Sequence, residues 1–154
     1  MRPTAAAVAL GLTLVLACVA PPNEAWLAAL RADAAPGGLA PETPLVLVWA
    51  EDPEAAWGRI VRARTEAPLE ESELLARVFE AAAVGPVEVA MGGPYSELNE
   101  QVMIDAFGIT ERDRVPGLRV LYVSPEPPGD RLLQLCERHR AACLHRPWRG
   151  DPPR

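Results

Sequence analysis

The chain contains no lysine and few aromatic residues, which make up 5% of its 154 residues. All fifteen basic residues are therefore arginine, a pattern that coding bias explains and from which no nucleic-acid binding follows. The net charge of −6 argues further against non-specific nucleic-acid binding, because an acidic surface repels a polyanion. With so few aromatic rings, we expect a core built mainly of Leu, Val and Ala.

Other absences limit the chemistry that the chain can perform. There is no Cys-x-x-Cys pair, which excludes a thioredoxin-type oxidoreductase. The chain has two histidines, both close to the C-terminus, and no nucleophile motif or triad order accompanies them. We therefore expect a protein that is not an enzyme and that holds no cofactor.

The N-terminal apolar run is too short to cross a membrane permanently. Ala5 to Ala17 carries no charge and follows Arg2. As a helix it would measure about 20 Å, against roughly 30 Å for the hydrocarbon core of a bilayer. The run therefore predicts a removable signal peptide over residues 1–17.

The end of this run, Val15-Leu16-Ala17-Cys18, resembles the lipobox of bacterial lipoproteins. In that family the cysteine thiol is acylated, typically with palmitate, and becomes the new N-terminus. The resemblance implies lipidation of Cys18, attachment to a membrane, and a domain in the periplasm or at the cell surface. Val19 is not the acidic retention residue of some lipoproteins, so the analogy favours the outer membrane.

Residues 18–44 are rich in Pro and Gly and are expected to form a tether, which a short helical piece over Asn23 to Asp33 interrupts. That piece carries Trp26, Leu27 and Leu30 at helical spacing, which fits docking on the domain or lying on the membrane. The tail, residues 149–154, is expected to be disordered.

Residues 45–148 are expected to form one domain. Apolar runs predict strands over 45–49, 86–91 and 117–124. Helices are predicted over 53–66, 70–83, 96–107 and 130–144, the first capped by Asp52 and burying Trp57, Ile60 and Val61, and the third capped by Gly108. This alternation is typical of a small single-domain α/β layer fold with about three strands in a parallel or mixed sheet.

Charge is distributed unevenly along the chain. Residues 18–129 hold eight arginines against eighteen acidic residues, whereas residues 130–154 hold six arginines against three. A basic end on an acidic body fits contact with phosphates, acidic glycans or lipid headgroups. The simpler interpretation is a solvated helix face and tail.

Once Cys18 is set aside, Cys136 and Cys143 form an even pair, which allows a disulfide in an oxidising compartment. On one continuous helix their Cα atoms would be about 10.5 Å apart, too far for a bridge, so the helix would have to end near His139. Alternatively, Cys136, His139, Cys143 and His145 supply ligand types that suit zinc or copper. The simplest alternative is that these side chains only pack one helix face.

A second candidate site is the turn Gly92-Gly93-Pro94-Tyr95-Ser96, which lies between a predicted strand and a predicted helix. Ligands often bind at such a place, and Gly92, Gly93 and Ser96 would let a phosphate approach the backbone. The spacing matches no known phosphate-binding signature, and Glu97 and Glu100 would repel an anion. Turn and capping duty is the simpler interpretation.

The segment from Leu45 to Val61 is similar to the periplasmic domain of the ExbD/TolR biopolymer-transport family. It shares an apolar strand, an acidic turn at Glu51-Asp52, and an aromatic residue that introduces an amphipathic helix; Pro86 to Met91 would be the next strand. The family's membrane helix and its intramembrane aspartate are absent. The resemblance therefore implies only a periplasmic module that contacts peptidoglycan or a partner protein.

These observations predict a non-catalytic, lipid-anchored protein of the cell envelope whose domain binds an envelope protein or peptidoglycan. One alternative is a periplasmic lipoprotein that binds a small ligand or a metal through the segment 136–145 or the Gly92-Gly93 turn. Another is an enzyme whose site matches no known motif.

Overall fold

Four parallel strands form the sheet of the computed structural model, which describes residues 30–32, 39–40 and 42–148. The strands are β1 (Leu45–Leu47), β2 (Val87–Gly92), β3 (Leu118–Ser124) and β4 (Ala142–Pro147), and they lie side by side in the order β1-β2-β3-β4. Every neighbouring pair is parallel. The prediction of an α/β fold is confirmed, with four strands where the sequence predicted about three.

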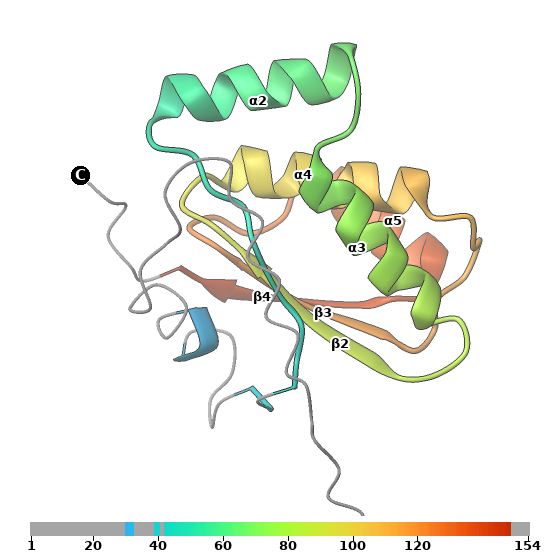
Figure 1. Cartoon of the computed structure of the whole chain (residues 1–154). Coiled ribbons are helices and arrows are strands. Elements are labelled where there is room, and N and C mark those ends of the chain that lie inside the picture. The colour runs from blue at the N-terminus through green and yellow to red at the C-terminus, as the bar shows by residue number, and fades with distance from the viewer. Residues whose placement is uncertain (1–29, 33–38, 41, 149–154) are drawn as a thin grey trace, which may run out of the picture.

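The helices α2 (Pro53–Thr65), α3 (Glu70–Ala81), α4 (Ser96–Ile109) and α5 (Asp130–His139) connect these strands and lie together on one face of the sheet (Figure 1). Right-handed crossovers between parallel strands explain this arrangement. Because each strand pairs with the next one in the chain, the direction of winding never reverses, and every crossover leads to the same face.

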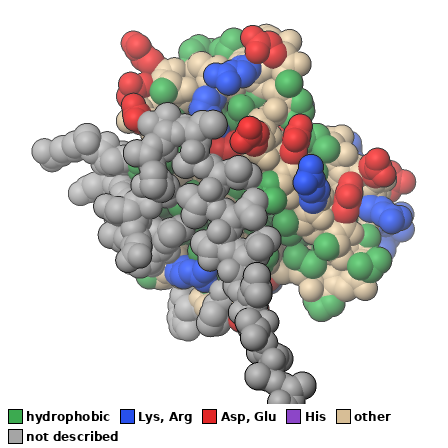
Figure 2. Space-filling view, in the orientation of Figure 1, with side chains coloured by type: hydrophobic (Ala, Val, Ile, Leu, Met, Phe, Trp, Pro, Cys, Tyr) green, Lys and Arg blue, Asp and Glu red, His purple; other side chains and the backbone are tan. Residues whose placement is uncertain are grey.

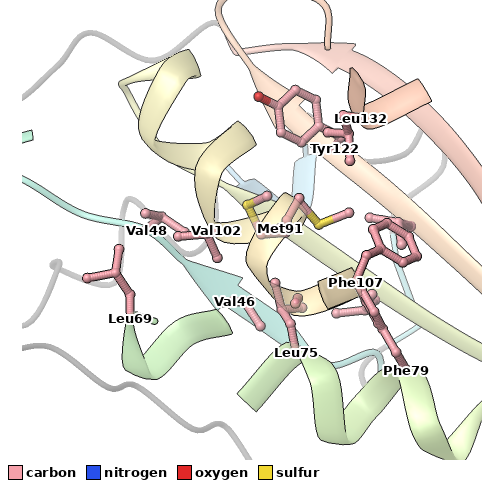
Figure 3. Packing of buried hydrophobic residues seen from close by; sticks show 14 of the residues in the cluster. Val46, Val48, Leu69, Leu75, Phe79, Met91, Val102, Phe107, Tyr122 and Leu132 are labelled. Atoms are coloured by element: carbon pink, nitrogen blue, oxygen red, sulfur yellow. The ribbon is translucent and has the colours of Figure 1, made fainter. Parts of the chain in front are cut away.

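The main core lies between the sheet and the helices (Figure 3). Alternate residues of the strands point into it, such as Val89 and Met91 of β2, and they meet side chains of α3 and α4. Phe79 and Phe107 are in contact there, with ring centroids 4.7 Å apart. This packing fixes where the strands end, and therefore where the loops that follow them gather.

The other face of the sheet has a smaller apolar cluster, and none of the helices α2 to α5 covers it. Leu45, Ala90, Leu121 and Val123 line this face, and the cluster also contains Leu30, Trp148 and, at its edge, Leu39 and Leu47. Leu30 is fully buried there. A residue of the expected tether thus packs against the domain.

The start of α2 is as predicted: Asp52 is the N-cap and accepts a hydrogen bond of 2.6 Å from the backbone N–H of Ala55, and Pro53 follows it. The predicted buried face of α2 is partly wrong. Trp57 and Val61 are 54% and 41% exposed, whereas Ala56 and Ile60 are buried. The helix therefore packs through Ala56 and Ile60 and leaves its larger Trp57 side chain more than half exposed.

The last predicted helix is also too long. Helix α5 ends at His139, and Arg140 adopts a left-handed conformation with φ of 57°, after which the chain turns back into β4. Gly108 was a predicted C-cap, but α4 continues through it to Ile109 and is capped by Thr110. The predicted signal peptide 1–17, Cys18 and the tail 149–154 lie outside the described residues.

Candidate functional site

An open groove lies at the carboxyl edge of the sheet, between the start of α2, the start of α4 and the loop after β3. Its volume is about 360 Å³. In doubly wound sheets a crevice forms where the winding reverses, but this sheet has no such reversal. The groove arises instead because the loops after β1, β2 and β3 all reach this edge. Its lining residues are Pro53, Ala56, Trp57, Ile60, Pro94, Tyr95, Ser96, Glu97, Pro125 and Glu126.

The floor and walls of the groove are mostly apolar. Ala56 and Ile60 are buried beneath it, and the indole of Trp57 is 54% exposed beside it. Tyr95 stands on the wall contributed by the loop after β2. Desolvation, together with the nearby carboxylate of Asp52, raises the pKa of Tyr95. A tyrosine hydroxyl is in any case protonated at neutral pH and can donate a hydrogen bond.

The rim of the groove is acidic. Glu97 and Glu126 belong to its lining, and Glu51, Asp52 and Glu54 are exposed where α2 begins. Figure 2 shows acidic side chains at the upper left and others spread, together with arginines, over the rest of this face. The guanidinium of Arg59 does not offset them, because it is held by the Trp49 carbonyl and by the buried Glu71 carboxylate.

Ser96 ties two walls of the groove together. Its hydroxyl accepts hydrogen bonds from the Ser124 hydroxyl at 2.8 Å and from the backbone N–H of Glu126 at 3.0 Å. Its carbonyl accepts a hydrogen bond of 3.0 Å from the hydroxyl of Tyr122, whose pKa burial raises to about 12. Through these hydrogen bonds, Ser96 holds the loops after β2 and β3 together. The shape of the groove is therefore preformed.

The two glycines of this turn are required by close packing. A Cβ on Gly92 would lie 2.7 Å from the carbonyl oxygen of Val123 and 2.9 Å from the side chain of Leu30. A Cβ on Gly93 would lie only 2.0 Å from the carbonyl oxygen of Val48. Both glycines therefore face protein atoms, and of the three predicted ligand residues only Ser96 lines the groove.

The four predicted metal ligands do not form a site for an ion. Cys136 and Cys143 form a disulfide with their Cα atoms 6.1 Å apart, which removes both thiolates as ligands. The buried ring of His139 packs against Phe107, with centroids 4.9 Å apart. His145 lies 3.0 Å from the carbonyl oxygen of Ser124 through its Nε2. Within residues 30–32, 39–40 and 42–148, no group of three or more His, Cys, Asp or Glu is placed to hold a metal ion.

Among the described residues, no helix has the length and apolar character needed to cross a membrane. Fold and site together define an α/β protein with a singly wound parallel sheet and an open, acid-rimmed groove. In comparisons with known proteins, no family model, no curated protein and no solved structure matches the chain.

The sequence argument placed a candidate ligand site at the turn that ends in Ser96 but did not predict the groove itself, although signals for it were present. Trp57 was assigned to the core, and Tyr95 was named only as a member of the turn between residues 92 and 96. Prolines shortly after two predicted strands, at Pro94 and Pro125, mark the loops that meet at the carboxyl edge of a parallel sheet. An aromatic residue in a helix that begins at the same edge was the third signal.

Proposed function

We propose that the chain is an exported, lipid-anchored protein of the cell envelope whose α/β domain binds a partner without catalysing a reaction. The disulfide between Cys136 and Cys143 is the observation that carries this proposal. Disulfides persist in oxidising compartments such as the periplasm and are rare in the cytosol. The apolar leader and the lipobox-like Cys18 also predict export.

The cysteine count fits the same proposal. The chain has three cysteines, and the disulfide uses two of them, which leaves Cys18. A cysteine without a disulfide partner in an oxidising compartment is expected to be reactive unless it is modified. Acylation at Cys18 accounts for it and attaches the domain to a membrane, of which the outer membrane is the proposed one.

A binding role suits the polar groups at the carboxyl edge better than a catalytic one. The hydroxyl of Ser96 is hydrogen-bonded to Ser124 and to the backbone of Glu126, and the His145 ring lies against the carbonyl of Ser124. Covalent catalysis requires a nucleophile within hydrogen-bond reach of its base. Here serine and histidine both serve to hold loops. The proposed partner is an envelope protein or peptidoglycan.

The anchor is tested by producing the full chain in a bacterium that processes lipoproteins and labelling with palmitate. We expect label on the wild-type chain, none on Cys18→Ser, and mass spectrometry showing an acylated N-terminal Cys18. An intact Met1 with an unmodified thiol at position 18 would contradict the proposal.

Partner binding is tested separately by crosslinking in intact envelopes, followed by purification of the chain. A protein or wall fragment should be recovered in larger amounts with this chain than with an unrelated lipoprotein of similar size that is purified in the same way. If neither is enriched, the proposed binding role is wrong. The proposed lipid anchor is not affected by that result.

A further inference from the structure

We propose that the groove between α2, α4 and the loop after β3 binds an extended, cationic and proline-containing segment of a partner protein. This inference rests on the proposed binding function and specifies its site and the chemistry of its ligand. It concerns the groove residues Pro53, Trp57, Tyr95, Glu97, Pro125 and Glu126.

The shape and lining of the groove favour an extended peptide. Grooves lined by aromatic and proline side chains bind polyproline-type segments, which have little conformational entropy to lose on binding. Here Trp57 and Tyr95 supply the aromatic surfaces, and Pro53, Pro94 and Pro125 supply stiff walls. The hydroxyl of Tyr95 adds a donor for a peptide carbonyl, because such a segment leaves its carbonyls without internal partners.

The exposure of Trp57 is the second argument. Helix α2 buries Ala56 and Ile60 but leaves this indole 54% exposed, in a chain that has few aromatic residues. An exposed tryptophan beside a groove is typical of a binding site, since Trp is enriched among the residues that dominate interface energies. Its ring face also attracts cations, and arginine in particular.

The acidic residues in and beside the groove favour a positively charged ligand. Glu97 and Glu126 lie in the groove, and Glu51, Asp52 and Glu54 are exposed close to it. A segment with arginine or lysine would be attracted both by these carboxylates and by the indole face of Trp57. Phosphate groups and the carboxylates of peptidoglycan stem peptides would be repelled, so charge favours a protein partner over the wall polymer.

The groove needs little rearrangement to bind. Ser96 joins the loops after β2 and β3, and Asp52 caps the helix that carries Trp57. Preorganised walls lower the entropic cost of association. The groove as it stands is therefore suited to bind the segment directly.

The test uses the full chain with Cys18→Ser and a peptide probe of about twelve residues made of repeated Pro-Pro-Arg, measured by titration calorimetry at low salt. We expect binding to the probe and none to the same peptide with Glu in place of Arg. Raising the salt from about 50 to about 300 mM should weaken binding several-fold, because exposed charges are screened.

Two groove variants locate the binding. Trp57→Ala should weaken binding by about tenfold or more, and Trp57→Phe should restore part of it. Glu97→Gln with Glu126→Gln should weaken it several-fold. The matched control, Glu73→Gln with Glu137→Gln, makes the same charge change on exposed positions of α3 and α5 and should leave binding unchanged. Thermal melting checks that each variant is folded.

Three outcomes would overturn the inference. One is equal binding of the Glu-containing peptide. Another is binding of peptidoglycan fragments in place of the peptide. The third is binding of the peptide only after removal of residues 149–154, because the occupant would then be the chain's own Pro-Pro-Arg tail. Since the experiment uses purified Cys18→Ser chain, failure of the anchor does not affect its result.

Discussion

Cys136 on α5 and Cys143 on β4 are joined by a disulfide, although seven residues of continuous helix would keep them apart. Their Cα atoms are 6.1 Å apart, against about 10.5 Å along a helix. The difference arises at Arg140, whose left-handed conformation ends α5 and sends the chain back along the sheet. The bridge thus holds the edge strand β4 against the helix that precedes it.

Removing this bridge should lower the stability of the domain. In the chain-entropy description, a loop of this length contributes about 2–3 kcal/mol to the free energy of unfolding. We therefore expect the double variant Cys136→Ala and Cys143→Ala, in a Cys18→Ser background, to melt roughly 10 °C lower than its parent. The measurement is calorimetric melting of both proteins with and without a reducing agent.

The reducing agent provides the control for that prediction. It should lower the melting temperature of the parent to about that of the double variant and leave the variant unchanged. A parent whose melting temperature does not respond to full reduction would show that the bridge makes no contribution.

Strand β4 is the part of the fold that could not be predicted from the sequence. Strands β1, β2 and β3 are apolar runs bounded by Pro or Gly, and this pattern was enough to predict an α/β fold. The segment Ala142–Pro147 has no β-branched residue, and Ala141 just before it and Ala142 at its start favour helix, so local propensity predicted that α5 would continue. Pairing with β3 over six residues overrides that preference.

The groove was harder to predict than the fold because its lining depends on how far helix α2 is rotated about its own axis. On α2, Trp57 and Ala56 are adjacent, and either phase of the helix places an apolar stripe inward. In the structure α2 contacts α4, Ala56 is buried, and Trp57 lies at the groove. The cap at Asp52 depends on local residues alone and was predicted correctly.

Gly93 provides a sharp test of the turn after β2. Gly93→Ala would place a Cβ 2.0 Å from the carbonyl oxygen of Val48 and 2.8 Å from Oδ1 of Asn99. The backbone oxygen cannot move without shifting the chain that follows β1. We expect a loss of about 3 kcal/mol or more in the free energy of unfolding, measured by urea denaturation.

Gly108→Ala is the matched control for Gly93→Ala. Gly108 lies within α4, and a Cβ there would meet nothing within 4 Å. Alanine should stabilise the helix by about 0.5–1 kcal/mol because it loses less backbone entropy than glycine. Similar losses in both variants would contradict the packing argument.

Leu30 tests whether the segment before β1 is part of the folded domain. Its side chain is fully buried with Leu121, Val123 and Trp148 on the face of the sheet that α2–α5 leave uncovered. Leu30→Ala should therefore cost about 2–3 kcal/mol in the free energy of unfolding.

Leu133→Ala, on the 46% exposed side chain of Leu133 in α5, should cost less than about 1 kcal/mol. If Leu30→Ala cost no more than this control, the segment would not be docked in solution, and the domain would begin near residue 42.

Asp105 on α4 should make stability depend on pH. Its Oδ1 accepts a hydrogen bond of 2.7 Å from Gln101, and its buried Oδ2 has no partner within the part of the chain that the structure describes. Burial raises the pKa of Asp105 despite the opposing effects of that hydrogen bond and of Arg131 and Arg64. The folded state therefore binds this proton more tightly than the unfolded state. The resulting stabilisation is present below the unfolded pKa of about 3.9 and is lost as the pH rises through the folded pKa.

Asp105→Asn reproduces the protonated side chain at every pH and can still accept the hydrogen bond from Gln101. We expect the variant to be more stable than wild type at neutral pH, and the difference to shrink as the pH falls to about 3.5, where the wild-type carboxyl is itself protonated. Urea denaturation at both pH values measures it. Asp113→Asn, at an exposed position, should change stability little at either pH. A gain for Asp105→Asn that stayed the same at both pH values would mean that hydrogen bonding, and not the buried charge, causes it.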